Sequence, residues 1–322
     1  MKTLITIDDF FDLYYKIQIK GLNIITDRLG FNTKSRVKNV WNRSNNPPTN
    51  WWVIPEIQKR WNVLISGQPN IEYQNYFVNE YLIEKRNLKL LSPGCGNGIK
   101  EVKYAKYENF ELIDAFDIAP NRIKDAIAIS KKNGLDNIAF SINDLLSFDY
   151  INNKYDIVVC DMILHHIKRL DIILEKVKNT LKPGGLLVIN EYVGPNRFQF
   201  PSEQISHAEK LLKDMPTKFR KRWNSNSVKS KIYKPGILRM ILADPSEAIN
   251  SEKILPEITK RFKIIEEKPY GGNMLHLILK DISHNFLNDD DGLKLLTQLF
   301  EAEDEFIHSN NSSDFLFGVY RK

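Results

Sequence analysis

The residues best suited to hold a ligand form a glycine-rich segment in the first third of the chain. Gly94, Gly96 and Gly98 alternate directly after the mostly apolar run 88–91, and a segment of helical character follows them. Glycine lets the backbone approach a ligand closely, and the N-terminus of a following helix offers unpaired N–H groups and a positive dipole end. This pattern is typical of a turn that holds a nucleotide-like ligand at the end of a strand.

The residues around the glycines narrow the type of ligand. A phosphate-binding loop requires Lys and Ser or Thr after its last glycine, but Ile99 and Lys100 stand there. A dinucleotide fingerprint requires its third glycine one residue later. Asp117 closes the second apolar segment, where a carboxylate can accept hydrogen bonds from both ribose hydroxyls. Asp144 follows the third segment, where it could bind the amino group of an adenine.

Two consecutive histidines, His165 and His166, follow the fourth apolar segment. A neutral imidazole suits proton transfer because its ordinary pKa of about 6.5 lies near operating pH. Only one of two consecutive residues easily points into a site, and the other could cap the next helix or pack beneath the ligand. Glu191, after the fifth apolar segment, could orient the base or form an ion pair at the rim. We therefore expect a proton-transfer site and favour His165 as the base.

A magnesium site is an alternative at the same strand ends. Asp161 ends the fourth apolar segment and Asn190 and Glu191 end the fifth, so three oxygen ligands could meet near a catechol-like acceptor. These residue types are common at such positions, and we expect no metal. The two cysteines, Cys95 and Cys160, exclude a disulfide framework and are expected to be small buried residues rather than nucleophiles.

The elements that position these residues follow from the alternation of the sequence after residue 88. Five apolar, strand-like segments alternate with helical segments at 98–107, 120–133 and 170–181. Such alternation predicts an α/β fold with a parallel, doubly wound sheet and helices on both faces. In these sheets ligands bind at the carboxyl ends of the strands, near the switch point of the strand order.

Five segments resemble, in order and spacing, the motifs of class I S-adenosylmethionine-dependent methyltransferases: SPGCGNG, FDIAPNRI, INDLL, YDIVVCDMILHHI and LKPGGLLVINEY. The resemblance covers roughly residues 88–193. It implies a doubly wound seven-stranded sheet, with six parallel strands and one antiparallel, and S-adenosylmethionine as the cofactor. More loosely, WNVLISG, NEYVGPNRFQF, DPSEA and DFLFGVYRK are similar to bacterial small-molecule methyltransferases of surface-polysaccharide or secondary-metabolite pathways.

The resemblance also assigns the cofactor-binding residues. It places the glycine backbone under the methionine part of the cofactor, Asp117 on the ribose and Asp144 on the adenine amino group. One position departs from the family, which commonly has an acid two residues before the first glycine, where this chain has Ser92. The role of that acid would pass to Ser92, to water or to another residue such as Glu101. The expected cofactor-binding residues are Ser92, Gly94, Cys95, Gly96, Gly98, Asp117, Ile118, Asn143, Asp144, Leu145 and Asp161.

Four regions are expected along the chain. They are a helical, aromatic-rich prefix or lid (1–86), the cofactor-binding core (87–195), a basic helical insertion after strand five (196–250), and C-terminal strands and helices that complete the sheet (251–322). The prefix is expected to begin with an amphipathic helix over residues 6–29. The acceptor pocket should come from the prefix and the insertion. Its expected residues are Arg60, Trp61, Tyr73, Tyr192 and Arg197.

The charge of the chain bears on the acceptor. The net charge is +6, and residues 209–234 alone hold nine Lys or Arg against two acids, an excess of +7. This segment is either a solvated helical face or a surface for an anionic acceptor such as a phosphate, a nucleotide-sugar or an acidic glycan. Arg197 could clamp such an anion or anchor its own loop.

We expect methyl transfer to a small-molecule or glycan acceptor, at a hydroxyl oxygen. An RNA methyltransferase is the alternative enzyme because of the basic segment. Strand four, however, ends in DMILHH rather than the Asn/Asp-Pro-Pro-aromatic motif of enzymes that methylate exocyclic amino groups, so nucleic acid is not the expected partner. A cofactor-binding scaffold subunit is the third possibility, suggested by Ser92. The lack of an apolar stretch of about 20 residues predicts a cytoplasmic protein without a membrane span.

Overall fold

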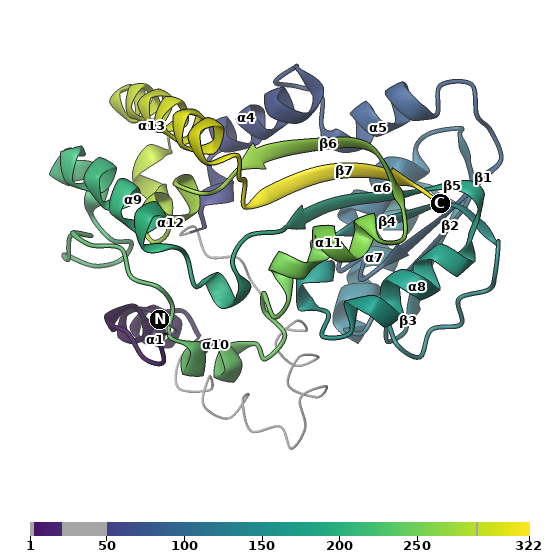
Figure 1. The fold of residues 1–322 in the computed structure, drawn as a ribbon, viewed down its shortest axis with the longest axis horizontal. Coiled ribbons are helices and arrows are strands. Elements are labelled where there is room, and N and C mark those ends of the chain that lie inside the picture. The colour runs from purple at the N-terminus through teal and green to yellow at the C-terminus, as the bar shows by residue number, and fades with distance from the viewer. Residues whose placement is uncertain (1–2, 21–49, 288) are drawn as a thin grey trace.

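The computed structural model describes residues 3–20, 50–287 and 289–322. They form one seven-stranded sheet of order β3-β2-β1-β4-β5-β7-β6 (Figure 1). The strands are β1 (Leu88–Pro93), β2 (Phe110–Asp117), β3 (Ile138–Ile142), β4 (Tyr155–Asp161), β5 (Leu181–Tyr192), β6 (Lys263–Gly271) and β7 (Phe315–Arg321). β1 to β5 pair in parallel, and β7 pairs antiparallel with both β5 and β6. The predicted doubly wound sheet with one antiparallel strand is confirmed.

The central strands are buried on both faces, which explains their almost continuous apolar sequences. Successive side chains of a strand point to opposite faces of the sheet. Leu90 and Val159 therefore belong to one hydrophobic cluster, whereas Leu91 and Val158 belong to a second. Each face carries its own core, so the sheet is the middle layer of three.

Helices cover both faces of the sheet. α4 (Pro55–Ser66), α5 (Tyr73–Tyr81) and α6 (Ile99–Ala105) contribute residues to the first cluster, and α8 (Leu170–Thr180) and α11 (Ile254–Thr259) contribute to the second. α7 (Pro120–Lys132) contacts β2 and β3. The predicted helices after the first, second and fourth strands are thus present.

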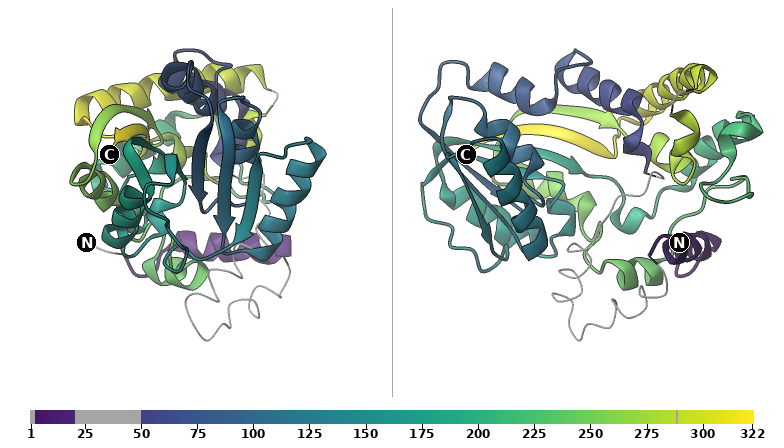
Figure 2. Two further views of the ribbon diagram at one scale, coloured as in Figure 1. Left: turned by 90° about the vertical axis from the view of Figure 1, so that its right-hand side faces the viewer. Right: turned by 180° about the vertical axis from the view of Figure 1, so that it is seen from behind.

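The prefix begins with α1 (Ile7–Lys20), and the rest of the helix expected to residue 29 lies outside the described residues. Asp9 Oδ2 accepts the backbone N–H of Thr6 at 2.8 Å, and Asp9 Oδ1 accepts that of Gly236 at 2.8 Å. α1 thereby lies beside α10 (Ile237–Ala243), on the opposite side of the molecule from α4 and α5 (Figure 2). The acidic first turn of α1, rather than its apolar face, makes these contacts: Phe10 remains 68% exposed.

The aromatic residues of the prefix pack inside the protein. Trp51 is buried and lies edge-on to Trp61, with ring centroids 5.0 Å apart. Both rings also contact Phe315 at the start of β7. Trp51 therefore anchors the prefix onto the sheet.

The insertion contains α9 (Ser202–Asp214), a 3-10 turn (Thr217–Arg220) and α10, with an irregular stretch between them. Two of its basic residues are buried and are not exposed to solvent. Arg222 Nη1 lies 2.8 Å from Asp281 Oδ2, and Lys229 Nζ donates to the carbonyls of Leu277 and Ile278. Part of the basic excess of this segment is therefore structural, which weakens the argument for an anion-binding surface.

The C-terminal region contributes β6 and β7 to the sheet. Between β6 and β7 lie α12 (Leu275–Leu279), a 3-10 turn (Ser283–Phe286) and α13 (Asp290–Asn310). Within the ranges that the structure describes, no helix combines the length and the apolar character needed to cross a membrane.

Candidate cofactor and active site

The glycine turn after β1 is fixed to the neighbouring strand. The backbone N–H groups of Gly94 and Cys95 both donate to Phe116 O, at 2.7 and 3.0 Å. A Cβ at Gly94 would lie 2.5 Å from Ile163 Cγ1, and one at Gly98 would lie 2.7 Å from Ala126 Cβ. These two glycines are thus required by packing within the protein.

Gly96 differs from the other two glycines. At this position a Cβ would meet a single heavy atom within 4 Å among the described residues, Arg122 Nη1 at 3.3 Å. Its φ of +57° favours glycine for conformational rather than packing reasons. The backbone at Gly96 is therefore the most open part of the turn and the part that a ligand can approach.

Asp117 ties the glycine turn to the end of β2. Its Oδ2 accepts the N–H of Gly96 at 3.0 Å, and its Oδ1 accepts that of Ala119 at 2.8 Å. Burial raises the pKa of Asp117, and these backbone hydrogen bonds oppose the shift. Because each carboxylate oxygen has two lone pairs, Asp117 can still accept hydrogen bonds from ribose hydroxyls.

The segment expected to bind the adenine lies next to Asp117. Asn143 donates its N–H to Asp117 O at 3.0 Å, and Asp144 Oδ1 accepts the N–H of Leu146 at 2.9 Å. Three predicted cofactor segments (the glycine turn, Asp117 and the 143–145 loop) therefore meet at one edge of the sheet.

Glu101 lies beside the position where the family commonly has an acid. Its Oε1 is 2.7 Å from Ser92 Oγ, and both side chains are buried. Glu101 Oε2 is buried and has no hydrogen-bond partner in the described part of the chain. Burial raises the pKa of Glu101 to about 7. An unpaired buried carboxylate oxygen beside an open glycine turn fits a ligand that carries a cationic group, as S-adenosylmethionine does.

Asp161, at the end of β4, is the centre of a second polar group. Its carboxylate contacts Tyr73 OH and Lys100 Nζ, and Asn190 Nδ2 donates to it at 3.2 Å. Tyr270 OH in turn donates to Asn190 Oδ1 at 2.6 Å. The network joins α5, α6, β4, β5 and β6 at the edge that holds the cofactor segments.

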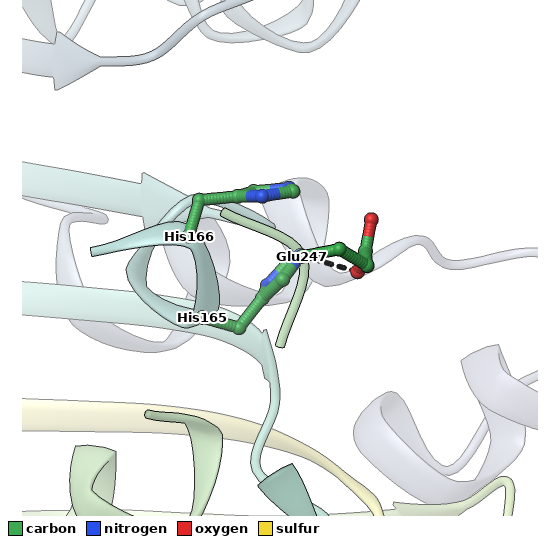
Figure 3. Close-up of side chains that lie close together, drawn as sticks. All are labelled: His165, His166 and Glu247. Carbon is green, nitrogen blue, oxygen red and sulfur yellow. Dashed lines mark ion pairs between the residues drawn. The ribbon is translucent and has the colours of Figure 1, made fainter. Parts of the chain in front are cut away.

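The histidines lie in a 3-10 turn after β4 (Leu164–His166). Their ring centroids are 4.1 Å apart, and Glu247 from the insertion lies beside both (Figure 3). Glu247 Oε1 is 3.6 Å from His165 Nε2. His166 Nδ1 is 3.1 Å from Ser246 Oγ.

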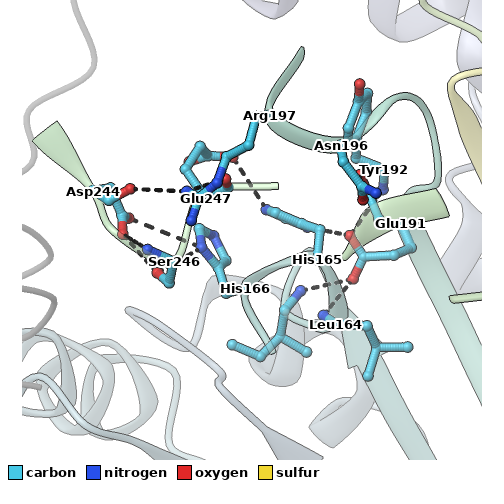
Figure 4. Close-up of polar contacts among 12 residues, drawn as sticks. Leu164, His165, His166, Glu191, Tyr192, Asn196, Arg197, Asp244, Ser246 and Glu247 are labelled. Atoms are coloured by element: carbon cyan, nitrogen blue, oxygen red, sulfur yellow. Dashed lines mark hydrogen bonds and ion pairs between the residues drawn. The ribbon is translucent and has the colours of Figure 1, made fainter. Parts of the chain in front are cut away.

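Glu191 holds this turn in place (Figure 4). The side chain is fully buried, and its Oε2 accepts the N–H groups of Ile163 at 2.9 Å and Leu164 at 2.6 Å. Its Oε1 accepts the N–H of Tyr192 at 2.8 Å and contacts His165 Nδ1. Glu191 therefore fixes the ring of His165 so that Nε2 points away from the buried carboxylate.

The magnesium site considered from the sequence is not formed by this arrangement. Asn190 and Glu191 are consecutive residues of β5, so their side chains point to opposite faces of the sheet. Asn190 bonds to Asp161, whereas Glu191 bonds to the histidine turn.

The two histidines differ in pKa. Burial lowers the pKa of both rings, but nearby carboxylates outweigh this effect at His165 and raise its pKa to about 8. At His166 burial dominates and lowers the pKa to about 3.

Arg197 anchors the segment that carries Glu247. Its guanidinium donates to Glu247 O at 2.8 Å and Pro245 O at 2.6 Å, and its backbone N–H donates to Ala248 O at 2.7 Å. Ile249 N–H donates to His165 O at 3.0 Å. Of the two roles considered for Arg197, these contacts are those of a loop anchor.

The other residues expected on the acceptor side have separate contacts. Arg60 forms a bidentate pair with Asp304 of α13, at 2.6 and 3.0 Å. Trp61 packs against Trp51, and Tyr192 is buried with its OH donating to Pro195 O at 3.0 Å. Tyr73 alone among the expected acceptor residues joins the Asp161 network directly. Glu247 and Ser246 were not expected from the sequence, although DPSEA stood out by resemblance, since neither periodicity nor spacing relates them to the histidines.

Comparison with protein families decides which group the chain belongs to. Residues 84–267, more than half of the chain, match the family described as a methyltransferase domain. The chain belongs to this methyltransferase family. The match begins just before β1 and ends within β6, so it contains the glycine turn, Asp117 and the histidine turn. The resemblance to class I enzymes is confirmed, with S-adenosylmethionine as the cofactor.

Curated relatives share part of this methyltransferase. The ubiquinone biosynthesis O-methyltransferase of Rickettsia canadensis (strain McKiel) is 28% identical over 121 residues, which covers 34% of this chain and 49% of that protein. The ribosomal protein L11 methyltransferase of Dictyoglomus turgidum is 34% identical over 119 residues, which covers 36% of each protein. The chain thus spans half or less of the length of these relatives.

Solved methyltransferases share the fold over most of the chain. Geranyl diphosphate C-methyltransferase from Streptomyces coelicolor A3(2) has a TM-score of 0.52 and 11% identity, covering 90% of this chain and 97% of that chain. Phosphoethanolamine N-methyltransferase 2 from Haemonchus contortus, solved with S-adenosyl-L-methionine, has a TM-score of 0.52 and 14% identity. The match covers 89% of this chain and 60% of that chain. At these sequence identities the similarity shows a shared fold.

Proposed function

We propose that this methyltransferase moves the methyl group of S-adenosylmethionine to a hydroxyl oxygen of a small-molecule acceptor. The observation that supports this is the link between the cofactor turn and a fixed imidazole. Ile163 packs against Gly94 of the turn, and Glu191, which accepts the N–H of Ile163, also holds His165 two residues later. A proton acceptor is thereby positioned close to the cofactor segments.

The cofactor supplies a methyl group that is already activated by its sulfonium, so the protein mainly positions the reactants. The glycine turn supports the methionine part of the cofactor, Asp117 binds the ribose, and Asp144 binds the amino group of the adenine. Glu101 offers its unpaired oxygen to the cationic amino group. His165 takes the acceptor's hydroxyl proton at Nε2, while Glu191 fixes the ring through Nδ1. The carboxylate of a catalytic triad orients its histidine base in the same way.

Two relatives bear on the class of the acceptor. A relative named for ubiquinone biosynthesis O-methylation supports a hydroxyl acceptor, while one named for ribosomal protein L11 covers a similar share of the chain. We favour a small molecule or glycan because no separate nucleic-acid-binding unit is visible among the described elements. The remaining exposed cations of the insertion support an anionic acceptor less strongly than the sequence suggested, since Arg222 and Lys229 are buried.

The test is a labelling experiment with S-adenosylmethionine that carries a radioactive methyl group. The purified full chain is incubated with phenolic, sugar and nucleotide-sugar acceptors, and in parallel with RNA and ribosomal protein. Label in a small hydroxyl compound, lost in Glu191→Gln, supports the proposal. Label in RNA or protein instead, or cofactor binding without transfer to any acceptor, overturns it in favour of the alternative enzyme or of a scaffold subunit.

A further inference from the structure

Two imidazoles and one carboxylate converge at the histidine turn (Figure 3). One possible ligand atom from each of His165, His166 and Glu247 lies within 4.8 Å of the other two. We propose that these three residues bind a divalent transition-metal ion of the Zn²⁺ type. The site brings together consecutive residues of the core and a residue of the insertion, so it exists only in the folded protein.

The separation of two of the ligand atoms suits such an ion. Zn²⁺ binds His nitrogen and carboxylate oxygen at about 2.0–2.2 Å, so neighbouring ligands of a tetrahedral site lie roughly 3.4 Å apart. His165 Nε2 and Glu247 Oε1 are 3.6 Å apart. The side chain of Glu247 is 28% exposed and ends a flexible stem, so it can close this small difference.

An oxygen atom lies beside Nδ1 of each ring. Ser246 Oγ donates its only proton to Asp244 Oδ1 at 2.6 Å, so it accepts the Nδ1–H of His166. Glu191 likewise accepts the Nδ1–H of His165. A neutral imidazole that carries its proton on Nδ1 has its lone pair on Nε2. Metal-binding histidines are typically oriented by an oxygen acceptor on the second ring nitrogen, as both rings are here.

The local charge favours a dication. With neutral imidazoles, the carboxylates of Glu191, Asp244 and Glu247 stand against the guanidinium of Arg197, which leaves two negative charges in a largely buried region. A divalent ion would neutralise this excess. Two imidazole ligands select Zn²⁺, Co²⁺ or Fe²⁺ over Mg²⁺ and Ca²⁺, which prefer oxygen.

Three protein ligands leave a coordination position open, as in catalytic rather than structural sites. An acceptor hydroxyl bound there would lose its proton more readily. In the metal-bound protein His165 would be a ligand and could not accept the proton, so the proton of the bound hydroxyl would pass to solvent water. This consequence rests on the proposed function, whereas binding of the ion does not.

The experiment measures metal binding directly. The full chain is stripped with a chelator and titrated with Co²⁺, followed by its visible absorption, and then with Zn²⁺ by calorimetry. We expect one ion per chain, with at least a 10-fold loss of affinity in His166→Ala and in Glu247→Gln and no competition by Mg²⁺. His207→Ala, an exposed histidine on α9, is the matched control and should bind as the wild type does.

Cofactor affinity, measured on each variant, shows that the donor site remains folded. Absence of saturable binding at one equivalent, or equal affinity in wild type and His166→Ala, overturns the metal site. Methyl transfer by the stripped protein would leave the proposed function intact, and stoichiometric metal binding without any transfer would leave the metal site intact. The two proposals therefore fail in different measurements.

Discussion

Ser92 Oγ lies 2.7 Å from Glu101 Oε1, with both side chains buried beneath the glycine turn. The acid that class I methyltransferases commonly carry on the first strand is replaced here by a serine that holds an acid from the following helix. The second oxygen of Glu101 stays unpaired among the described residues. This relationship moves the expected contact with the cofactor's amino group from β1 to α6.

We expect Glu101→Gln to weaken S-adenosylmethionine binding by about 10-fold or more, because a hydrogen bond to a charged group contributes roughly 1.5–3 kcal/mol. Calorimetric titration with the cofactor measures the change. The double variant Ser92→Asp, Glu101→Ala returns the acid to the strand and should recover most of the affinity that Glu101→Ala alone loses. Equal affinities of wild type and Glu101→Gln would show that the carboxylate does not face the cofactor.

Glu101 should also make stability depend on pH. Burial raises its pKa from 4.5 in the unfolded chain to about 7 in the folded protein, so the folded protein binds the extra proton between these values. The contribution to stability is therefore fully present below pH 4.5 and is lost as pH rises through 7, by up to about 3 kcal/mol.

Urea unfolding at several pH values between 5 and 8 measures this slope. Burial also raises the pKa of Asp314 to about 7, so the informative quantity is the difference between wild type and Glu101→Gln. The variant should show a flatter dependence of the free energy of unfolding on pH. Parallel curves for the two proteins would contradict the assignment.

Substitutions at two glycines of the turn should have different effects, one mainly on stability and the other mainly on cofactor binding. In Gly98→Ala the new Cβ would approach Ala126 and Phe140 to 2.7 Å at a φ of +71°, so we expect a loss of about 3 kcal/mol in the free energy of unfolding. In Gly96→Ala the new Cβ would meet the end of the flexible Arg122 side chain at 3.3 Å, and the φ of +57° costs about 1 kcal/mol. Its main effect should be on cofactor affinity, measured by titration beside denaturant unfolding. A larger stability loss in Gly96→Ala than in Gly98→Ala would refute this division.

The meeting of two expected donor-side segments could be predicted from the sequence because Asp117 and Asn143 lie at the ends of two successive strands. The parallel topology brings such strand ends to one edge, so Asp117 and Asn143 meet as expected. The contact between Glu247 and His165 could not be predicted in this way. It joins residues about 80 positions apart through an insertion whose path depends on tertiary contacts such as those of Arg197. The exposed face of α1 has the same explanation, since amphipathic periodicity does not say what a helix packs against.

Arg197→Lys should loosen the segment 244–249 without affecting the donor site. A lysine cannot supply the planar pair of donors that reaches the carbonyls of Pro245 and Glu247. We expect faster amide hydrogen exchange at Ala248 and Ile249 and a loss of about 1–2 kcal/mol in the free energy of unfolding. Cofactor affinity should stay within about 2-fold of wild type. A clear loss of cofactor affinity with unchanged exchange would point to a ligand contact instead of an anchor.

Glu191→Gln should damage catalysis more than it damages cofactor binding. The glutamine amide would direct N–H groups at donors of the histidine turn, where the carboxylate now accepts from Ile163, Leu164 and Tyr192. We expect the turn to shift and His165 to lose its fixed orientation, with kcat falling by about 100-fold and stability by about 2–4 kcal/mol.

Lys182→Gln, which removes a surface pair with Asp156, is a control for loss of one charged side chain and should keep kcat near the wild-type value. Cofactor titration completes the comparison, because a Glu191→Gln protein that binds S-adenosylmethionine normally yet turns over slowly places the defect at the histidine turn. If Glu191→Gln kept the wild-type kcat, the orientation of His165 by Glu191 would have no part in methyl transfer.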